Sequence, residues 1–173
     1  MFRLEHDILI EKSPEVVWAF LANLPVSLTC HRLRYRFQWI GTPKPGQGGR
    51  YSLELNLPGI ILQREGRITR WEPPHSLAMA QWSPQHPHRG FTRQQRLSVN
   101  PVEGRPGASV LRSTIVGNQR PWYVEILFKE IVRRGMLDHL EALKRAIEST
   151  DRSGRALRDP ARHLAEMPAA GTG

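Results

Sequence analysis

Two adjacent prolines interrupt the middle of the chain between two segments with the residue pattern of β-strands. Pro73 and Pro74 have no backbone N–H, so neither can donate a hydrogen bond within a sheet, and the pair belongs at a turn or an edge. Trp71 and Leu77 place bulky apolar side chains on either side of the pair. The stretch 66–77 therefore predicts a strand that ends at the prolines and a second strand that begins directly after them.

Alternation of apolar and polar residues predicts further strands before and after this corner. The expected strands cover residues 2–12, 33–39, 51–55, 59–71, 76–82, 91–99 and 109–116. A glycine- and proline-rich turn is expected at 43–49, a loop at 83–90 and a turn at 100–108. Most of the first two thirds of the chain is therefore expected to form a sheet.

Helix signals follow the first expected strand and the last one. Ser13 and Pro14 are typical of an N-cap and a first helical residue, and Pro25 is expected to end that helix. A second short helix is expected at 26–31. Apolar residues then recur with a helical period from 121 to 149, which predicts one long helix. Residues 150–173 lack an apolar face, so we expect one domain, 1–149, followed by a flexible tail.

Composition narrows the class of protein. The 173 residues can bury a substantial core. The formal charge of +9 raises the possibility of nucleic-acid binding, but the arginines are spread through strand-like segments without a Lys/Arg run, so no specific nucleic-acid partner is expected. One cysteine, Cys30, excludes an intramolecular disulfide framework. With no leader pattern or membrane-spanning run, the protein is expected to be cytoplasmic.

Four segments and their order resemble a known superfamily. They are Ile10 to Trp18, the turn Pro45 to Gly49, the stretch Gly66 to Leu77, and the long final helix. Across about residues 2–149, the chain resembles the START/Bet v 1-like superfamily, also called SRPBCC, in its polyketide cyclase/dehydrase-like branch. The resemblance implies an α+β helix-grip fold, in which a seven-stranded curved antiparallel sheet wraps around the C-terminal helix and two short helices follow the first strand.

The same resemblance implies a cavity between the sheet and the long helix. It further implies the binding of hydrophobic small molecules such as lipids, sterols, polyketides or plant-type aromatics, with enzymes as a minority of the superfamily. No catalytic residue of the superfamily maps onto this chain. The fold alone does not choose among these functions.

Strand alternation predicts which side chains would line such a cavity. The apolar phase turns inward Tyr35, Phe37, Trp39, Tyr51, Leu53, Leu55, Leu62 and Ile68. The same phase carries Arg64, Arg70, Arg93 and Gln95 inward. A buried guanidinium needs a partner, so one hypothesis is that Arg64, Arg93 and Gln95 hold a carboxylate, phosphate or enolate oxygen. The alternative is a β-bulge or an edge position that turns these arginines to solvent.

The long helix and one loop contribute the remaining candidates. Leu127 and Ile131 are expected on the inner side of the helix, mainly as core. Trp122 and Tyr123 are better placed to line the cavity mouth, with Trp82 opposite them.

Other motifs do not match known phosphate-binding, metal-binding or nucleophile patterns. The glycines of 46–49 lack the Gly-Lys-Ser/Thr ending of a phosphate-binding loop, so a tight turn is expected. His75, His86 and His88 have no neighbouring acid or cysteine, so no metal and no cofactor are expected. No Gly-x-Ser-x-Gly motif is present, and Cys30 and His31 are adjacent rather than paired as nucleophile and base.

Three functions remain open from the sequence. The first is binding or carriage of a hydrophobic small molecule, with an anionic or carbonyl end, in the cavity. The second is an enzyme of polyketide cyclase/dehydrase type that uses the same cavity. The third is an interaction module whose basic outer face meets an acidic partner or a membrane surface.

Overall fold

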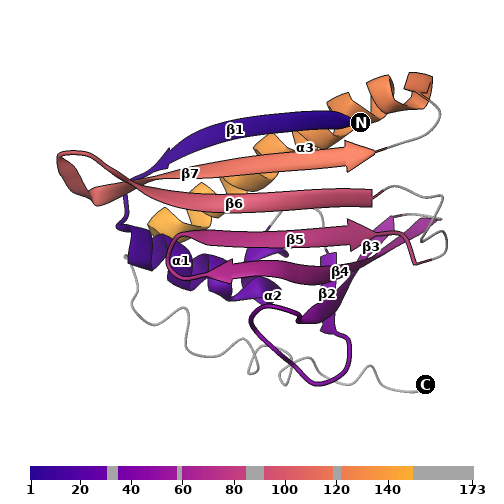
Figure 1. Cartoon of the computed structure of the whole chain (residues 1–173), viewed down its shortest axis with the longest axis horizontal. Coiled ribbons are helices and arrows are strands. Elements are labelled where there is room, and N and C mark those ends of the chain that lie inside the picture. The colour runs from indigo at the N-terminus through magenta and orange to yellow at the C-terminus, as the bar shows by residue number, and fades with distance from the viewer. Residues whose placement is uncertain (31–34, 58–59, 85–91, 119–121, 150–173) are drawn as a thin grey trace, which may run out of the picture.

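The strands and helices follow one another in the order expected from the sequence (Figure 1). A computed structural model describes residues 1–30, 35–57, 60–84, 92–118 and 122–149. Its elements are β1 (Phe2–Ile10), α1 (Pro14–Ala22), α2 (Leu24–Ser27), β2 (Tyr35–Trp39), β3 (Arg50–Leu57), β4 (Ile60–Glu72), β5 (Ser76–Trp82), β6 (Thr92–Val102), β7 (Arg105–Asn118) and α3 (Trp122–Ser149). The tail 150–173 lies outside the described residues.

All seven strands belong to one antiparallel sheet in the order β1-β7-β6-β5-β4-β3-β2. The three helices lie on one face of this sheet, and α3 runs behind β1 and β7 in Figure 1. We call the face toward the helices the inner face and the opposite face the outer face. The architecture is the α+β helix-grip fold, so this prediction from the sequence is confirmed.

Several boundaries differ from the expectation by a few residues, and two of the differences occur at prolines. Pro25 lies in the first turn of α2 rather than ending α1, because a proline needs no backbone donor there. The expected turn at 100–108 is mostly strand: β6 and β7 continue to a tight turn at Glu103 and Gly104, where Gly104 has φ +74°. Pro101 is tolerated in β6 because the register shifts beside it.

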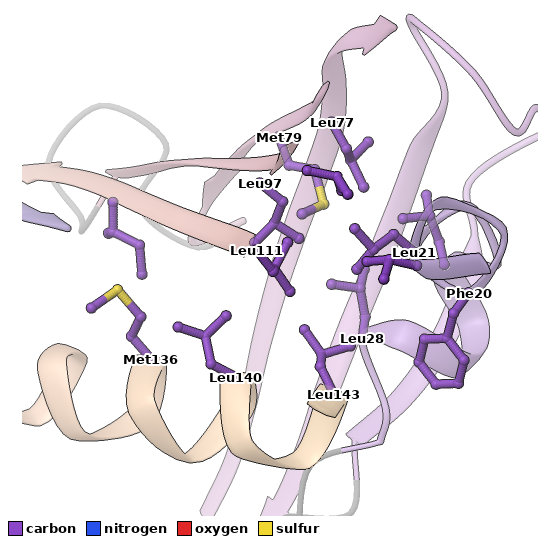
Figure 2. Close-up of a cluster of buried hydrophobic side chains, with 14 of the residues drawn as sticks. Phe20, Leu21, Leu28, Leu77, Met79, Leu97, Leu111, Met136, Leu140 and Leu143 are labelled. Atoms are coloured by element: carbon purple, nitrogen blue, oxygen red, sulfur yellow. The ribbon is translucent and has the colours of Figure 1, made fainter. Parts of the chain in front are cut away.

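The apolar core fills the space among α1, α2, the C-terminal part of α3 and the neighbouring part of the sheet (Figure 2). It includes Phe20, Leu21, Leu28, Leu77, Met79, Leu97, Leu111, Met136, Leu140 and Leu143. Along α3, the buried positions Val132, Met136, Leu140, Leu143 and Ile147 recur every three or four residues.

Ile131 departs from this stripe. Its side chain is 65% exposed, so the expectation that it faces inward is wrong. The reason is helical geometry: Val132, the next residue, lies about 100° further around the helix and takes the inward position.

A bulge in β4 sets the orientation of the side chains before the double-proline corner. Ile68 pairs with Met79 and Arg70 pairs with Ala78, so Thr69 is an extra residue relative to β5. Arg70 is therefore exposed and pairs with Glu72 at 3.1 Å, and the expectation that Arg70 turns inward is wrong.

Trp71 takes the inner position beyond the bulge. Its ring meets that of Trp18 edge to face, with the centroids 5.3 Å apart. The chain then turns at Pro73 and Pro74, where the backbone N–H of His75 donates to the carbonyl oxygen of Glu72 at 2.7 Å. The corner predicted from the two prolines is confirmed, and it is held against α1 by this aromatic contact.

On the inner face, the aromatic ring of Tyr51 lies over Gly66 of β4. Gly66 pairs with Tyr51 of β3, and a Cβ at Gly66 would stand 2.3 Å from Cζ of the Tyr51 ring. Only a residue without a side chain leaves room for the ring to reach across β4 toward β5.

Within the described residues, no helix has the length and apolar character needed to span a bilayer.

We expect Gly66→Ala to destabilise the fold, because the added methyl group overlaps the buried Tyr51 ring. Overpacking of this kind costs about 1–3 kcal/mol of the free energy of unfolding, which urea unfolding followed by circular dichroism would measure. An unchanged unfolding midpoint would contradict the crossing of the ring.

Gly135→Ala should have the opposite effect. Gly135 lies inside α3, is exposed, and has no atom within 4 Å of an added Cβ. Alanine is favoured over glycine inside a helix by about 1 kcal/mol, so the same urea titration should show a more stable protein. A loss of stability in Gly135→Ala would contradict the exposed, open position of Gly135 in α3.

Candidate functional site

A group of polar side chains interrupts the apolar inner face at the end away from α1. We call it the inner-face polar cluster, and it consists of Tyr51, Gln81, Arg93, Gln95 and Ser113. The strand register brings the group together from β3, β5, β6 and β7, because paired residues of an antiparallel sheet project to the same face.

Two rows of cross-strand partners contribute four of the five cluster residues, and Ser113 lies one row further along, opposite Leu97. In one row Arg93 of β6 pairs with Gln81 of β5, which pairs with Gly66 of β4. Gly66 in turn pairs with Tyr51, whose ring covers it. In the next row Gln95 lies between Met79 and Ile115.

A chain of hydrogen bonds fixes the orientation of the Arg93 guanidinium. Its Nη2 donates to Oε1 of Gln95 at 2.6 Å, and Nε2 of Gln95 donates to Oγ of Ser113 at 3.3 Å. The Nε of Arg93 is buried and has no hydrogen-bond partner within the described part of the chain. Buried donors are almost always satisfied in folded proteins, so this N–H is an exception that needs an explanation.

The surroundings of Arg93 also disfavour its charged form. Burial, followed by the positive charge of Arg64, lowers the pKa of Arg93 to about 10, against the smaller opposing influence of the Tyr51 and Tyr35 hydroxyls. The group stays charged at neutral pH. No carboxylate of the described residues forms an ion pair with Arg93.

Arg64 lies on the same face as this cluster. It pairs with Leu53, a buried inner-face residue, and its own side chain is half-buried. The bulge anticipated as an alternative exists, but it follows Arg64 in the strand and so leaves its phase unchanged.

Tyr51 is the second polar centre. Its hydroxyl oxygen accepts a hydrogen bond from Nε2 of Gln81 at 3.0 Å, and the hydroxyl donates to Sδ of Met79 at 3.2 Å. Phe37 stacks on the ring with the centroids 5.5 Å apart. Burial raises the pKa of Tyr51 to about 12, so the hydroxyl keeps its proton at neutral pH.

Most of the residues expected to line the inner face lie there. Tyr51, Leu53, Leu55, Ile68 and Gln95 are buried. Tyr35, Phe37 and Trp39 are partly buried on β2, where each pairs with an inner-face residue of β3. Their role in binding a ligand remains a prediction.

The residues expected around the cavity mouth are either on the outer face or have side chains outside the described residues. Trp82 pairs with Glu65 and Thr92, and Gln81 occupies the inner position beside it, so the register places Trp82 on the outer face. This departs from the expected position at an inner mouth, and the cause is the strict alternation along β5. The side chains of Trp122, Tyr123 and Leu127 lie outside the described residues.

Gln81 and Ser113 were missed by the sequence reasoning. Both are polar residues at inward positions of strands that are otherwise apolar on that face: Gln81 follows Met79, and Ser113 lies between Leu111 and Ile115. The sequence carried this signal. Only the register shows that the two residues belong to the same cluster as Arg93.

The remaining motifs are structural. The turn at 46–49 attaches to β4, because the N–H of Gly48 donates to the carbonyl oxygen of Ile68 and the N–H of Ile68 donates to that of Gly49, each at 2.9 Å. His75 is exposed at the double-proline corner, and His86 and His88 lie outside the described residues. Elsewhere in the described chain, no three His, Cys, Asp or Glu side chains group as metal ligands.

The outer face has a shallow hollow of about 430 Å³ that Arg3, Arg70 and Arg96 help to line. These cations already have partners: Arg3 pairs with Glu5 at 2.9 Å, Arg70 pairs with Glu72 at 3.1 Å, and Nε of Arg96 donates to Oγ of Ser76 at 3.1 Å. The inner-face polar cluster is therefore the stronger candidate site.

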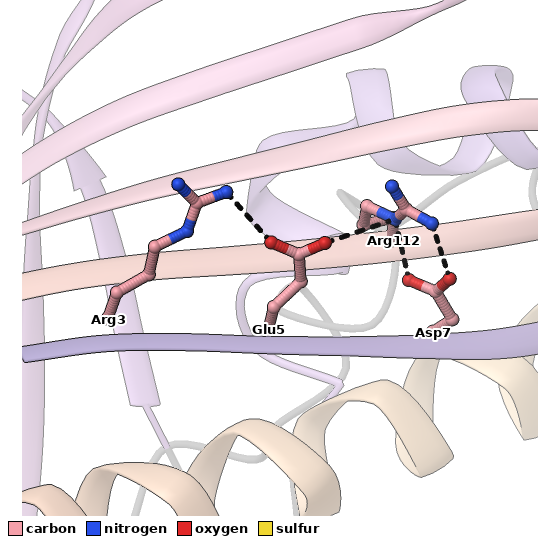
Figure 3. Close-up of polar contacts among 4 residues, drawn as sticks. All are labelled: Arg3, Glu5, Asp7 and Arg112. Carbon is pink, nitrogen blue, oxygen red and sulfur yellow. Dashed lines mark hydrogen bonds and ion pairs between the residues drawn. The ribbon is translucent and has the colours of Figure 1, made fainter.

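Ion pairs also neutralise the neighbouring part of the outer face on β1 and β7 (Figure 3). Arg112 makes two hydrogen bonds of 2.8 Å to the carboxylate of Asp7 and lies 3.6 Å from Glu5, which also meets Arg3. This part of the outer face therefore does not present a uniformly positive surface.

Solved structures show the same fold at low sequence identity, although no protein-family model and no curated protein matches the chain. The di-domain aromatase/cyclase BexL, from the BE-7585A biosynthetic pathway, aligns with a TM-score of 0.68 at 16% identity, over 88% of this chain and 48% of its own. Norcoclaurine synthase from Thalictrum flavum, solved with dopamine and hydroxybenzaldehyde, aligns with a TM-score of 0.64 at 14% identity, over 84% and 86%. Ara h 8.0201 aligns with a TM-score of 0.65 at 8% identity, over 86% and 98%.

The raised pKa of Tyr51 predicts a pH dependence of stability. The unfolded chain would ionise Tyr51 near its ordinary pKa of 10.0, whereas the folded protein holds the proton to about 12. Between these values the unfolded state binds fewer protons, so the free energy of unfolding falls as pH rises, by about 2–3 kcal/mol in all.

Tyr51→Phe removes this contribution and is the matched comparison. Urea unfolding of both proteins between pH 8 and pH 11.5 should give parallel profiles up to about pH 10, above which the wild type loses stability faster. Parallel profiles over the whole range would show that Tyr51 is not held in a buried, protonated state.

Proposed function

We propose that this protein binds or carries a hydrophobic small molecule of lipid, polyketide or aromatic type between the inner face of the sheet and α3. The observation that carries the proposal is the buried Nε–H of Arg93, which has no acceptor within the described residues although Gln95 and Ser113 hold the guanidinium in place. A bound molecule with an oxygen atom at this point would complete the hydrogen bonding.

The surroundings suit an apolar body with one polar end. Met79, Ile115 and Leu53 lie beside the cluster, and the rings of Phe37 and Trp39 extend the apolar surface along β2. Ligand sites of this kind are mostly apolar, with a few polar groups that fix the orientation of the ligand. The fold shared with norcoclaurine synthase and BexL is consistent with such a site.

Polyketide cyclase/dehydrase-type chemistry is the second candidate, and Tyr51 is the observation that favours it. Its hydroxyl stays protonated and donates only to a thioether sulfur, a weak acceptor, so it could turn to a ligand carbonyl or enolate oxygen. However, the buried polar side chains among the described residues are all serines and glutamines. None of them is therefore a carboxylate or an imidazole that could serve as a base. We therefore place carriage first, in the cytoplasmic setting expected from the sequence.

A neutral apolar dye tests the binding site directly. N-phenyl-1-naphthylamine fluoresces strongly only in apolar surroundings, and we expect one molecule to bind per folded chain in a saturable titration. Native mass spectrometry of protein purified from its own host should reveal a co-purified small molecule. A folded protein that is empty in the spectrometer and binds no dye would overturn the proposal.

Phe37→Ala and Ile61→Ala are the matched variants that locate the dye. Phe37 lies on the inner face, whereas Ile61 is 67% exposed and points to the opposite face of the sheet. Loss of the Phe37 ring should weaken dye binding roughly tenfold, equivalent to about 1.4 kcal/mol, and loss of the Ile61 side chain should not. The reverse order would place the dye on the outer face.

A further inference from the structure

The positive charge of Arg93 is the property of the inner-face polar cluster that the proposed function leaves unexplained. Arg93 and Arg64 project from the same face in neighbouring rows of the sheet. Apart from Arg64, the described side chains that contact or adjoin Arg93 in the sheet include the uncharged Gln95, Gln81 and Tyr51. Within the described residues, Arg93 has no carboxylate partner.

The protein tolerates this charge at some cost to its stability. The Arg93 side chain is half-buried, and partial removal of a cation from water is unfavourable unless the cation is paired. The two guanidinium groups also repel one another, and both effects lower the pKa of Arg93 to about 10. Leucine or methionine at this position would extend the apolar core without that cost. The bonds from Arg93 to Gln95 and from Gln95 to Ser113 nevertheless hold the guanidinium in one orientation.

We propose that the inner-face polar cluster is an anion-binding subsite, and that the molecule bound beneath α3 is an organic anion whose carboxylate or similar oxyanion accepts the Nε–H of Arg93. This inference rests on the proposed function and narrows its ligand class. Guanidinium groups bind carboxylate oxygens through two parallel N–H donors, and Nε supplies one of those donors.

Charge decides between an anion and a neutral oxygen. A ketone or alcohol oxygen would satisfy the Nε–H of Arg93 but would leave the charge of this half-buried guanidinium without compensation. An anion does both. The apolar neighbours Met79 and Ile115 favour an anion with a hydrocarbon or aromatic body over a small inorganic ion.

Two dyes that share a skeleton and differ in charge provide the test. 8-Anilinonaphthalene-1-sulfonate carries a sulfonate on the ring system of the neutral N-phenyl-1-naphthylamine. We expect wild-type protein to bind the sulfonate at least tenfold more tightly than the neutral dye. Arg93→Met should remove that preference, so that the variant binds the two dyes with affinities within about threefold of one another.

Arg96→Met is the matched control, because Arg96 lies on the outer face of the same strand and lines the outer hollow. Its preference for the sulfonate should equal that of the wild type. A preference that disappears in Arg96→Met and persists in Arg93→Met would place the anion on the outer face and overturn the proposal.

A comparison that needs no variant keeps the proposal testable if Arg93→Met does not fold. Decanoate and decanol should each displace the neutral dye from the wild type, decanoate at a concentration at least tenfold lower. Equal potencies would overturn the anion subsite and leave the proposed function standing. If the folded wild type binds neither dye, the proposed function itself fails.

Discussion

One extra residue in β4 determines which of that strand's side chains face the helices. Before the register shift at Thr69, Arg64, Gly66 and Ile68 lie on the inner face. After the shift, Trp71 lies on the inner face and Arg70 on the outer face. Without the bulge Arg70 would replace Trp71, and a guanidinium would lie against Trp18 and α1. The apolar core on one side of the bulge and the polar cluster on the other both depend on this change of phase.

The inner face is therefore divided between two tasks. Toward α1, α2 and the C-terminal part of α3 it is filled by leucine, methionine and aromatic side chains, and their burial supplies most of the stabilisation that the packing can give. Toward the other end the same face presents Tyr51, Gln81, Arg93 and Gln95. A protein that needed only a core would have no reason to interrupt it with a half-buried cation whose Nε is shielded from solvent.

The polar cluster is assembled with little freedom of movement. Gly66 lets the Tyr51 ring cross β4, Gln81 meets the hydroxyl from β5, and Gln95 and Ser113 fix Arg93 from β6 and β7. Each of these contacts joins different strands, so the arrangement is only as precise as the register of the sheet. Rigid, correctly oriented donors favour binding because less conformational entropy is lost when a ligand arrives.

The sequence by itself determined the order of the elements, the corner at Pro73 and Pro74 and the inward phase of most strands, because these follow from local periodicity and proline chemistry. The α+β helix-grip fold came from the resemblance that this order of elements carries. The sequence did not determine that Arg70 and Trp82 face outward, that Ile131 is exposed, or that Gln81 and Ser113 join Arg93. Only the tertiary structure decided those points. A bulge and the pairing of distant strands select one face for each side chain, and neither is encoded within a single strand.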